Sequence, residues 1–372
     1  MPNPQEPFDD GSSRATDFPR RTPAAVPSAW GANYNRISFA YRLIPAPALV
    51  LLRRLRYAYA QLCGCSRIAG EQIGVSWSRD WEVVRVVKHV AGAKPQVLRC
   101  DDEQRLLWRT EMGDFWAPEG SSPRFVSGLV IEALSDVYRF SRQKFRFPPI
   151  VIDAGANIGT FTRSALAQGA ARVICLEPSP LTADCLELTF EPEIRSGRVT
   201  VLRKGAWERV EILHFRNGNR PNPGAHSVVS APDEQTTTIQ ATTIDATVQE
   251  LGLRRVDFIK MDIEGAEASA LRGAFRTIGA FKPAIGMGTE HTADIAANNE
   301  AVIRIVREIE PSYRVECTEV HPVRSPSRGL ALTPYSLSFV CPGPDNRDLQ
   351  ERYASAPAAR LRIAAGRRED RE

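Results

Sequence analysis

Two acidic residues at the ends of apolar segments are the first candidates for chemistry in this sequence. Asp153 lies at the carboxyl end of the run 150–154, directly before a glycine-containing turn, and Glu177 follows the run 172–176. Parallel strands bring such residues to one edge of an open α/β sheet, where ligands bind. A carboxylate there suits an ammonium group, and the two oxygens of Glu177 can accept both hydroxyl hydrogens of a ribose. The pair predicts a nucleoside site.

The turn between these acids restricts which nucleoside fits. Gly155 permits a positive φ and lets a ligand lie against bare backbone, and Gly159 allows the next helix to begin close to the sheet. A dinucleotide turn needs Gly-x-Gly-x-x-Gly, because the pyrophosphate must approach the helix N-terminus. Asn157 occupies the middle glycine position, so its side chain obstructs a diphosphate, which Asp153 also repels. S-adenosylmethionine is positively charged and has no phosphate, so it fits both features; NAD fits neither.

A third motif places more acids at the end of an apolar segment. Residues 256–261 lead into Asp262, Glu264 and Glu267, where a helix begins. Acids in a first helical turn commonly complement the helix dipole, and this explains Glu267. For Glu264 the same explanation and a functional role stay open. Asp262 lies nearest the expected cleft, and we assign it to the site.

Methylation of a hydroxyl oxygen would need a base, and two residues are placed to provide it. An alcohol is a poor nucleophile while it keeps its proton. The candidates are Asp262 and His291, which follows the apolar run 284–287. An unperturbed imidazole pKa of about 6.5 suits proton removal near neutrality. Glu290 is placed to orient the imidazole or contact the acceptor, whereas simple solvation at the surface is the alternative for His291.

Other candidate sites receive less support. For His226, in the loop 223–227, we favour a structural role. Cys63 and Cys65 lack the second pair of ligands that a zinc site needs, so we expect no metal. The sequence contains no Gly-x-Ser-x-Gly, His-Glu-x-x-His or Gly-Lys-Ser/Thr motif, which leaves hydrolase and kinase functions without support.

The elements that must carry these residues alternate between apolar strands and amphipathic helices. The predicted strands are 150–154, 172–176, 199–203, 256–261 and 284–287, and the predicted helices include 180–188 and 300–309. Such alternation predicts an α/β fold with a mainly parallel, doubly wound sheet. Residues 313–319 and 337–340 are expected to form an antiparallel strand pair. Short segments at 96–100, 106–110 and 115–117 predict an antiparallel sheet before the main domain.

The flanks of this domain differ in composition. Residues 1–35 are rich in Pro, Ser, Asp and Arg and are expected to be disordered. A small helical extension is predicted over 36–97, with one helix after Asp80; the main domain is expected over 98–342 and a charged tail over 343–372. The segment 48–62 contains three arginines. We favour a helix packed on the main domain with its arginines in water; an in-plane membrane helix or a partner-binding helix is the alternative.

Composition limits the remaining possibilities. Apolar residues make up 43% of the chain and charged residues 25%, as in soluble globular proteins. The formal net charge of +4 is small, and we expect no nucleic-acid partner. Seven scattered cysteines indicate reduced thiols and a cytoplasmic protein. The longest apolar stretch, 43–52, contains two prolines and is about half the roughly 20 residues that span a bilayer.

Taken together, these motifs resemble the FkbM family of S-adenosylmethionine-dependent methyltransferases over residues 100–342. The most specific stretches are 153–159, 177–178, 260–267 and 271–274, followed by 282–291. The resemblance implies a Rossmann-like fold of the class I methyltransferase type. It also implies O-methylation of a hydroxyl on a sugar, glycan or natural product. A nicotinamide-dependent oxidoreductase and a non-catalytic nucleoside-binding protein remain the alternatives.

The resemblance also implies roles for individual residues. Asp153, Gly155, Asn157 and Gly159 would hold the methionine part of the cofactor, and Glu177 would hold the ribose. Adenine would lie beside residues 205–207, which include Ala206 and Trp207. Trp207 would either stack on adenine or belong to the core beneath the next strand.

Overall fold

The computed structural model describes residues 94–216, 227–228, 236–317, 320–327 and 329–341, with short pieces between residues 45 and 75. The expected disordered segment 1–35, the helix after Asp80, His226 and the tail from residue 343 lie outside the described residues. Within the described part of the chain, no helix has the length and apolar character needed to cross a membrane.

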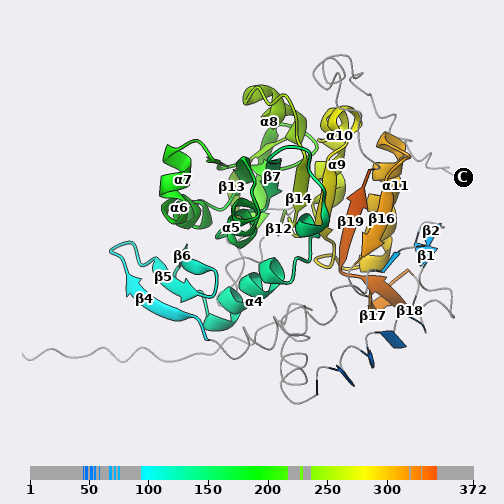
Figure 1. Cartoon of the computed structure of the whole chain (residues 1–372), viewed down its shortest axis with the longest axis horizontal. Helices are drawn as coiled ribbons and strands as arrows, with labels where there is room; N and C mark the ends of the chain where they lie inside the picture. Colours follow the sequence, from blue (N-terminus) through cyan, green and yellow to red (C-terminus); the bar gives the residue numbers. More distant parts are fainter. Residues whose placement is uncertain are drawn as a thin grey trace, which may run out of the picture.

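An eight-stranded mixed sheet forms the centre of the molecule (Figure 1). Its strand order is β3-β16-β19-β15-β14-β7-β8-β9. The strands are β3 (Gly74–Val75), β7 (Ile150–Ala154), β8 (Arg172–Leu176), β9 (Val199–Leu202), β14 (Phe258–Met261), β15 (Ala284–Gly288), β16 (Arg314–Cys317) and β19 (Ser336–Val340). The five strands from β9 to β15 are parallel, and β19 is antiparallel to both of its neighbours. This is the predicted doubly wound α/β sheet with its antiparallel C-terminal pair.

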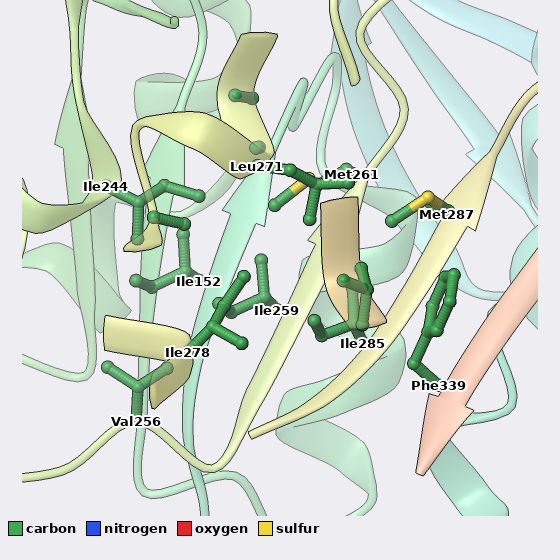
Figure 2. Close-up of a cluster of buried hydrophobic side chains, with 14 of the residues drawn as sticks. Ile152, Ile244, Val256, Ile259, Met261, Leu271, Ile278, Ile285, Met287 and Phe339 are labelled. Atoms are coloured by element: carbon green, nitrogen blue, oxygen red, sulfur yellow. The ribbon is translucent and has the colours of Figure 1, made fainter. Parts of the chain in front are cut away.

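Helices cover both faces of this sheet. They are α4 (Pro123–Leu134), α5 (Thr160–Ala167), α6 (Pro180–Thr189), α7 (Glu191–Arg195), α8 (Ile244–Glu250), α9 (Glu267–Arg272), α10 (Phe275–Phe281) and α11 (Ile295–Ile309). Because alternate residues of a strand point to opposite faces, Ile152 contributes to one core and Val151 to the other. Figure 2 shows the first core, in which Ile244, Leu271 and Ile278 from the helices pack on Ile152, Ile259 and Ile285.

Smaller sheets surround the main one. They comprise β1 (Arg67–Ile68) with β2 (Glu71–Gln72); β4 (Gln96–Cys100), β5 (Leu106–Thr110) and β6 (Gly113–Ala117); β10 (Gly205–Ala206), β13 (Thr236–Thr242), β11 (Glu211–Arg216) and β12 (Ser227–Val228); and β17 (Val320–Ser325) with β18 (Gly329–Pro334). The sheet β4–β6 is the predicted antiparallel lead-in. Trp108 and Phe115 from this sheet share the second core with α4, α5 and α6.

A short segment after α4 crosses the second face of the main sheet. It contains a 3-10 turn, Phe140–Arg142, and two residues with positive φ, Asp136 and Arg139. The Arg139 guanidinium is buried, donates to the Cys317 carbonyl oxygen and pairs with Glu316 on β16. These contacts fix the path of the segment 135–142, which carries Tyr138 to the centre of the sheet.

The segment 48–62 differs from its favoured interpretation. The residues described between 47 and 58 are helical, but Leu51, Leu52 and Leu55 are 57%, 51% and 56% exposed. A helix packed on the main domain would bury these leucines. The leucines described in this helix therefore do not pack on the main domain, and the packed helix stays a prediction.

Candidate active site at the carboxyl edge of the sheet

Residues 155–159, here called the glycine turn, connect β7 to α5 and use all of their own amides internally. The amides of Gly155 and Ala156 donate to the Leu176 carbonyl oxygen, and that of Gly159 donates to Ala156. Asn157 donates its amide to Glu177 Oε2 at 2.9 Å and accepts from Ile158 at its own Oδ1. No amide of this turn is left for a pyrophosphate. The turn therefore suits a ligand without phosphate. The prediction that Asn157 and Asp153 exclude a diphosphate stays a prediction.

The glycines of the turn serve close packing within the protein. Gly155 has a φ of +74°, and a Cβ there would lie 2.0 Å from the Asp262 carbonyl oxygen. Gly159 has a φ of +88°, and its Cβ would collide with the Phe190 ring at 2.2 Å. The positive φ predicted for Gly155 is confirmed. The close neighbour of Gly155 is the backbone after β14, however, and not an open face offered to a ligand.

Asp153 is completely buried and has an internal cation. Its Oδ2 accepts a hydrogen bond of 2.6 Å from the Thr162 hydroxyl, and its Oδ1 lies 3.1 Å from the Lys260 ammonium. Lys260 also donates to the Gly155 carbonyl oxygen at 2.6 Å. Burial opposes the Lys260 charge, but Asp153 and Asp262 raise its pKa. The sequence predicts a free carboxylate for a ligand ammonium, but Asp153 instead has a cationic partner within the protein.

Glu177, the predicted ribose-binding acid, accepts two backbone amides. Each carboxylate oxygen accepts one backbone amide, from Asn157 and from Ser179, both at 2.9 Å. A carboxylate oxygen can accept two hydrogen bonds, so each has one lone pair left. Glu177 is 5% exposed, and this burial raises its pKa to about 7.

Asp262, Glu264, Glu290 and His291 converge beyond the ends of β14 and β15 and are called the acid cluster below. The His291 Nδ1 lies 3.0 Å from Glu264, and its Nε2 lies 3.4 Å from Asp262 and 3.6 Å from Glu290. The structure thus brings together all three residues predicted to be catalytic. Glu264, whose role was open, lies on the Nδ1 side of the imidazole. Its own backbone has a positive φ of +56°.

The charges in this cluster alter the roles of its members. Burial opposes the His291 charge, yet Glu290, Glu264 and Asp262 raise its pKa well above 6.5. Burial also opposes ionisation of Asp262, but His291 and Lys260 hold the pKa of this carboxyl well below its usual range. A raised pKa favours the imidazolium form of His291, which has no free lone pair to remove a proton. The assignment of His291 as the base stays a prediction, and the three surrounding carboxyl groups weigh against it.

Tyr138 was not identified from the sequence. Its hydroxyl donates to Asp262 Oδ2 at 2.7 Å, and the Lys260 ammonium lies 5.4 Å from the centre of its ring. Tyr138 thus contacts the acid cluster and the lysine below the glycine turn. Its position 124 residues before Asp262 and the absence of any motif around it leave no sequence signal for this contact.

Glu132, on α4, was also missed. Its side chain is half-buried, and burial together with the charges of Asp262 and Glu290 raises its pKa to about 8. Glu132 therefore contributes to the electrostatics of the acid cluster. Like Tyr138, it lies before the motifs that identify the site.

Two glycines of β15 make room for these contacts. A Cβ on Gly286 would lie 2.3 Å from the Tyr138 carbonyl oxygen, and one on Gly288 would lie 2.8 Å from Asp262 Oδ1. Both face the same side of the sheet, since they are two residues apart in one strand. The sequence Gly-Met-Gly at 286–288 thus allows the segment carrying Tyr138 to pack directly on the sheet.

The residues expected near adenine follow strand β9, in and directly after the short strand β10. Ala206 is buried in β10. Trp207 is half-buried, and its indole Nε1 donates to Glu211 Oε1 at 2.9 Å. The two interpretations of Trp207 remain predictions. In the described part of the chain, no three His, Cys, Asp or Glu side chains are arranged to hold a metal ion.

Parts of this chain are similar to known proteins. The hexuronic acid methyltransferase AglP of Haloferax volcanii is 28% identical over 138 residues, 37% of this chain and 55% of that protein. The chain thus spans about half the length of this curated relative. The solved structure of methyltransferase FkbM from Methylobacillus flagellatus KT is 19% identical with a TM-score of 0.39, covering 59% of this chain and 56% of that one.

A second solved structure, a SAM-dependent methyltransferase from Agrobacterium tumefaciens, is 11% identical with a TM-score of 0.36, covering 66% of this chain and 72% of that one. The family model described as the methyltransferase FkbM domain matches residues 153–320. This range contains the glycine turn, Glu177 and the whole acid cluster. Residues 153–320 of this chain therefore match the methyltransferase FkbM domain.

Proposed function

We propose that this protein transfers a methyl group from S-adenosylmethionine to a hydroxyl group of a sugar, glycan or natural product. The observation that carries this proposal is the glycine turn, whose amides are all engaged within the protein beside the two open lone pairs of Glu177. A dinucleotide would have no amides of this turn for its pyrophosphate, and Asp153 lies under the first turn of α5. A ribose without a diphosphate fits.

The residues present fit this cofactor, which supplies an electrophilic methyl group when bound. Glu177 would accept the ribose hydroxyls, and Ala206 and Trp207 would border the adenine. Burial, together with repulsion from Asp262, raises the pKa of both Glu264 and Glu290. A nearby cation would favour the ionised form of each, so a positively charged cofactor is compatible with the acid cluster.

Asp262 is the group of this chain best placed to accept a hydrogen bond from the acceptor hydroxyl. Because its pKa is low, it would take the proton as the methyl group bonds to the oxygen, when that proton becomes strongly acidic. His291 and Tyr138 hold it ionised and oriented, and its Oδ1 is without a hydrogen bond that meets normal geometry. His291 would remain an imidazolium and act through Asp262. Glu290 would contact the acceptor from the other side. Positioning of this kind contributes a large share of catalysis in a transfer between two bound partners.

The curated relative is named for a hexuronic acid. An acceptor carboxylate beside ionised Asp262 would be repelled, so we propose a neutral hydroxyl as the acceptor here. Methyl transfer from labelled S-adenosylmethionine to matched panels of neutral, amino and uronic sugars and their glycosides tests this choice.

Binding of the cofactor is the first experiment. Isothermal titration calorimetry of the full chain should show saturable binding of S-adenosylmethionine, and no competition from NAD. Glu177→Ala should weaken this binding at least about tenfold, since it removes hydrogen bonds to a charged group worth about 1.5–3 kcal/mol. Arg203→Ala, on the surface of the same sheet end, is the matched control. Preferential binding of NAD, or equal affinity of Glu177→Ala and the wild type, would contradict the proposal.

A further inference from the structure

The exposed leucines before the main domain form one side of a helix. Leu51, Leu52 and Leu55 are each more than half exposed, and Leu51 and Leu55 are four residues apart. Residues at this spacing lie on one face of a helix. Among the described residues, Ala48 lies one turn before this group and Ala58 one turn after it, and both are helical. The segment thus presents an apolar stripe to solvent.

The segment also contains three arginines, at positions 53, 54 and 56. Of these, the structure describes Arg54, which lies about 60° around the helix from Leu51, at a border of the stripe. Arg54, at one border, is exposed. Long basic side chains at the borders of an apolar stripe can reach upward to charged groups while the stripe is buried. This is the pattern of a helix lying in a membrane interface.

The charged side chains in and around this helix are all basic. Between residues 36 and 70 the sequence contains six arginines and no acidic residue, whereas the complete chain has a formal net charge of only +4. The remaining residues therefore carry a net negative charge. A second copy of this segment would bring six further arginines against the first, so self-association is disfavoured by charge.

We infer that the helix within residues 47–58 binds the surface of an anionic lipid bilayer. The leucines would enter the interface, and the arginines would contact lipid phosphates and anionic headgroups. The segment lies at the periphery of the molecule, below β17 and β18 in Figure 1, where it is drawn in dark blue. A flat surface can therefore reach it without disturbing the main sheet. This inference does not depend on the proposed function.

Vesicle flotation with the full chain tests the inference. The protein should float with vesicles of phosphatidylcholine and phosphatidylglycerol, and much less with phosphatidylcholine alone. The variant Leu51→Ser/Leu55→Ser should reduce binding at least about tenfold. The variant Arg53→Gln/Arg54→Gln/Arg56→Gln should reduce it by roughly a hundredfold, as should high salt.

Leu181→Ser provides the matched control, because Leu181 is 63% exposed on α6, in the main domain. It should bind vesicles like the wild type. Circular dichroism and urea unfolding of each variant separate lost binding from lost folding. No flotation of the folded wild type, equal binding to both vesicle types, or full binding by the leucine variant would overturn the inference. So would sedimentation showing that the leucines instead hold two copies together.

Discussion

The Lys260 ammonium lies 3.1 Å from Asp153 Oδ1 and, on its other side, 2.6 Å from the Gly155 carbonyl oxygen. Lys260 and Asp153 are direct neighbours across the parallel strands β14 and β7. One buried cation therefore balances a buried carboxylate and also fixes the orientation of a peptide group in the glycine turn. These two contributions can be separated experimentally.

Lys260→Met should destabilise the protein by about 3–5 kcal/mol, because it leaves Asp153 buried without its cation. Adding Asp153→Asn removes the stranded charge, so the double variant should regain most of this stability in urea unfolding. Its affinity for S-adenosylmethionine, measured by calorimetry, should remain about tenfold lower than in the wild type, since the Gly155 carbonyl still lacks its donor. Recovery of both quantities would mean that Lys260 only balances charge.

Tyr138→Phe should reduce turnover while leaving cofactor binding nearly unchanged. It removes the 2.7 Å hydrogen bond to Asp262 but keeps the ring that packs edge-on against Phe161. Hydrogen bonds to charged groups contribute about 1.5–3 kcal/mol, so we expect kcat to fall about tenfold or more, with the cofactor Kd within about twofold. Steady-state kinetics with the acceptor from the sugar panel, and calorimetry, provide the two numbers. A loss in Kd as large as that in kcat would assign Tyr138 to the cofactor site.

Gly286→Ala should destabilise the protein by about 1–3 kcal/mol or more, because its Cβ would overlap the Tyr138 carbonyl oxygen. Gly279→Ala is the matched control. Gly279 lies inside α10, and its Cβ would make only ordinary contact, 3.9 Å from Ile309. Alanine there should stabilise the protein by about 0.5–1 kcal/mol. Urea unfolding of both variants measures these changes in stability. Similar unfolding midpoints would contradict the prediction, because they would mean that the segment carrying Tyr138 moves away from an alanine at position 286 at little cost in free energy.

Cofactor affinity should depend on pH through Glu177. With its pKa raised to about 7, this carboxyl is mostly protonated at pH 6 and mostly ionised at pH 8. The ionised form accepts ribose hydroxyls more strongly, so affinity should increase with pH, up to about tenfold between pH 6 and pH 8. Calorimetry at several pH values measures this change. Glu177→Gln should lack most of it, and a wild-type slope equal to that of the variant would exclude Glu177 as its source.

His291 should remain protonated at pH 7.5. Its pKa is raised well above 6.5 by the surrounding carboxylates, so its contribution to stability is fully present below pH 6.5. That contribution is lost as the pH increases through the pKa of the folded state. Nitrogen NMR of the imidazole, assigned with His291→Gln, reports its charge directly. The stability difference between wild type and His291→Gln should decrease toward high pH; a neutral ring at pH 7.5 would restore His291 as a candidate base.

The sequence predicted the main sheet well, because each strand is a short apolar run that ends at a turn or an acid. The predicted limits of β7 and β8 match the observed ones. The start of α11 was placed five residues late, since Ile295 is the only large apolar side chain of this helix before Val302. The acid cluster was also accessible, because its members directly follow β14 and β15.

The missing parts of the site depend on tertiary contacts. No residue near Asp153 in the sequence indicates that Lys260 will pair with its Oδ1. The pairing follows from the register of β14 and β7, which the sequence alone does not give. Likewise, a lone histidine has an ordinary pKa until three carboxylates are placed around it. The sequence identified the residues of the site, and their partners decided the charge that each carries.

The segment 135–142 has a practical consequence for how this protein can be truncated. The family match begins at residue 153, yet one wall of the acid cluster is Tyr138, held in place by Arg139 and its contacts with β16. A truncated protein trimmed to the family boundary would lose that wall and expose the glycine face of β15 to water. The smallest unit able to reproduce the site must therefore start no later than α4, at Pro123.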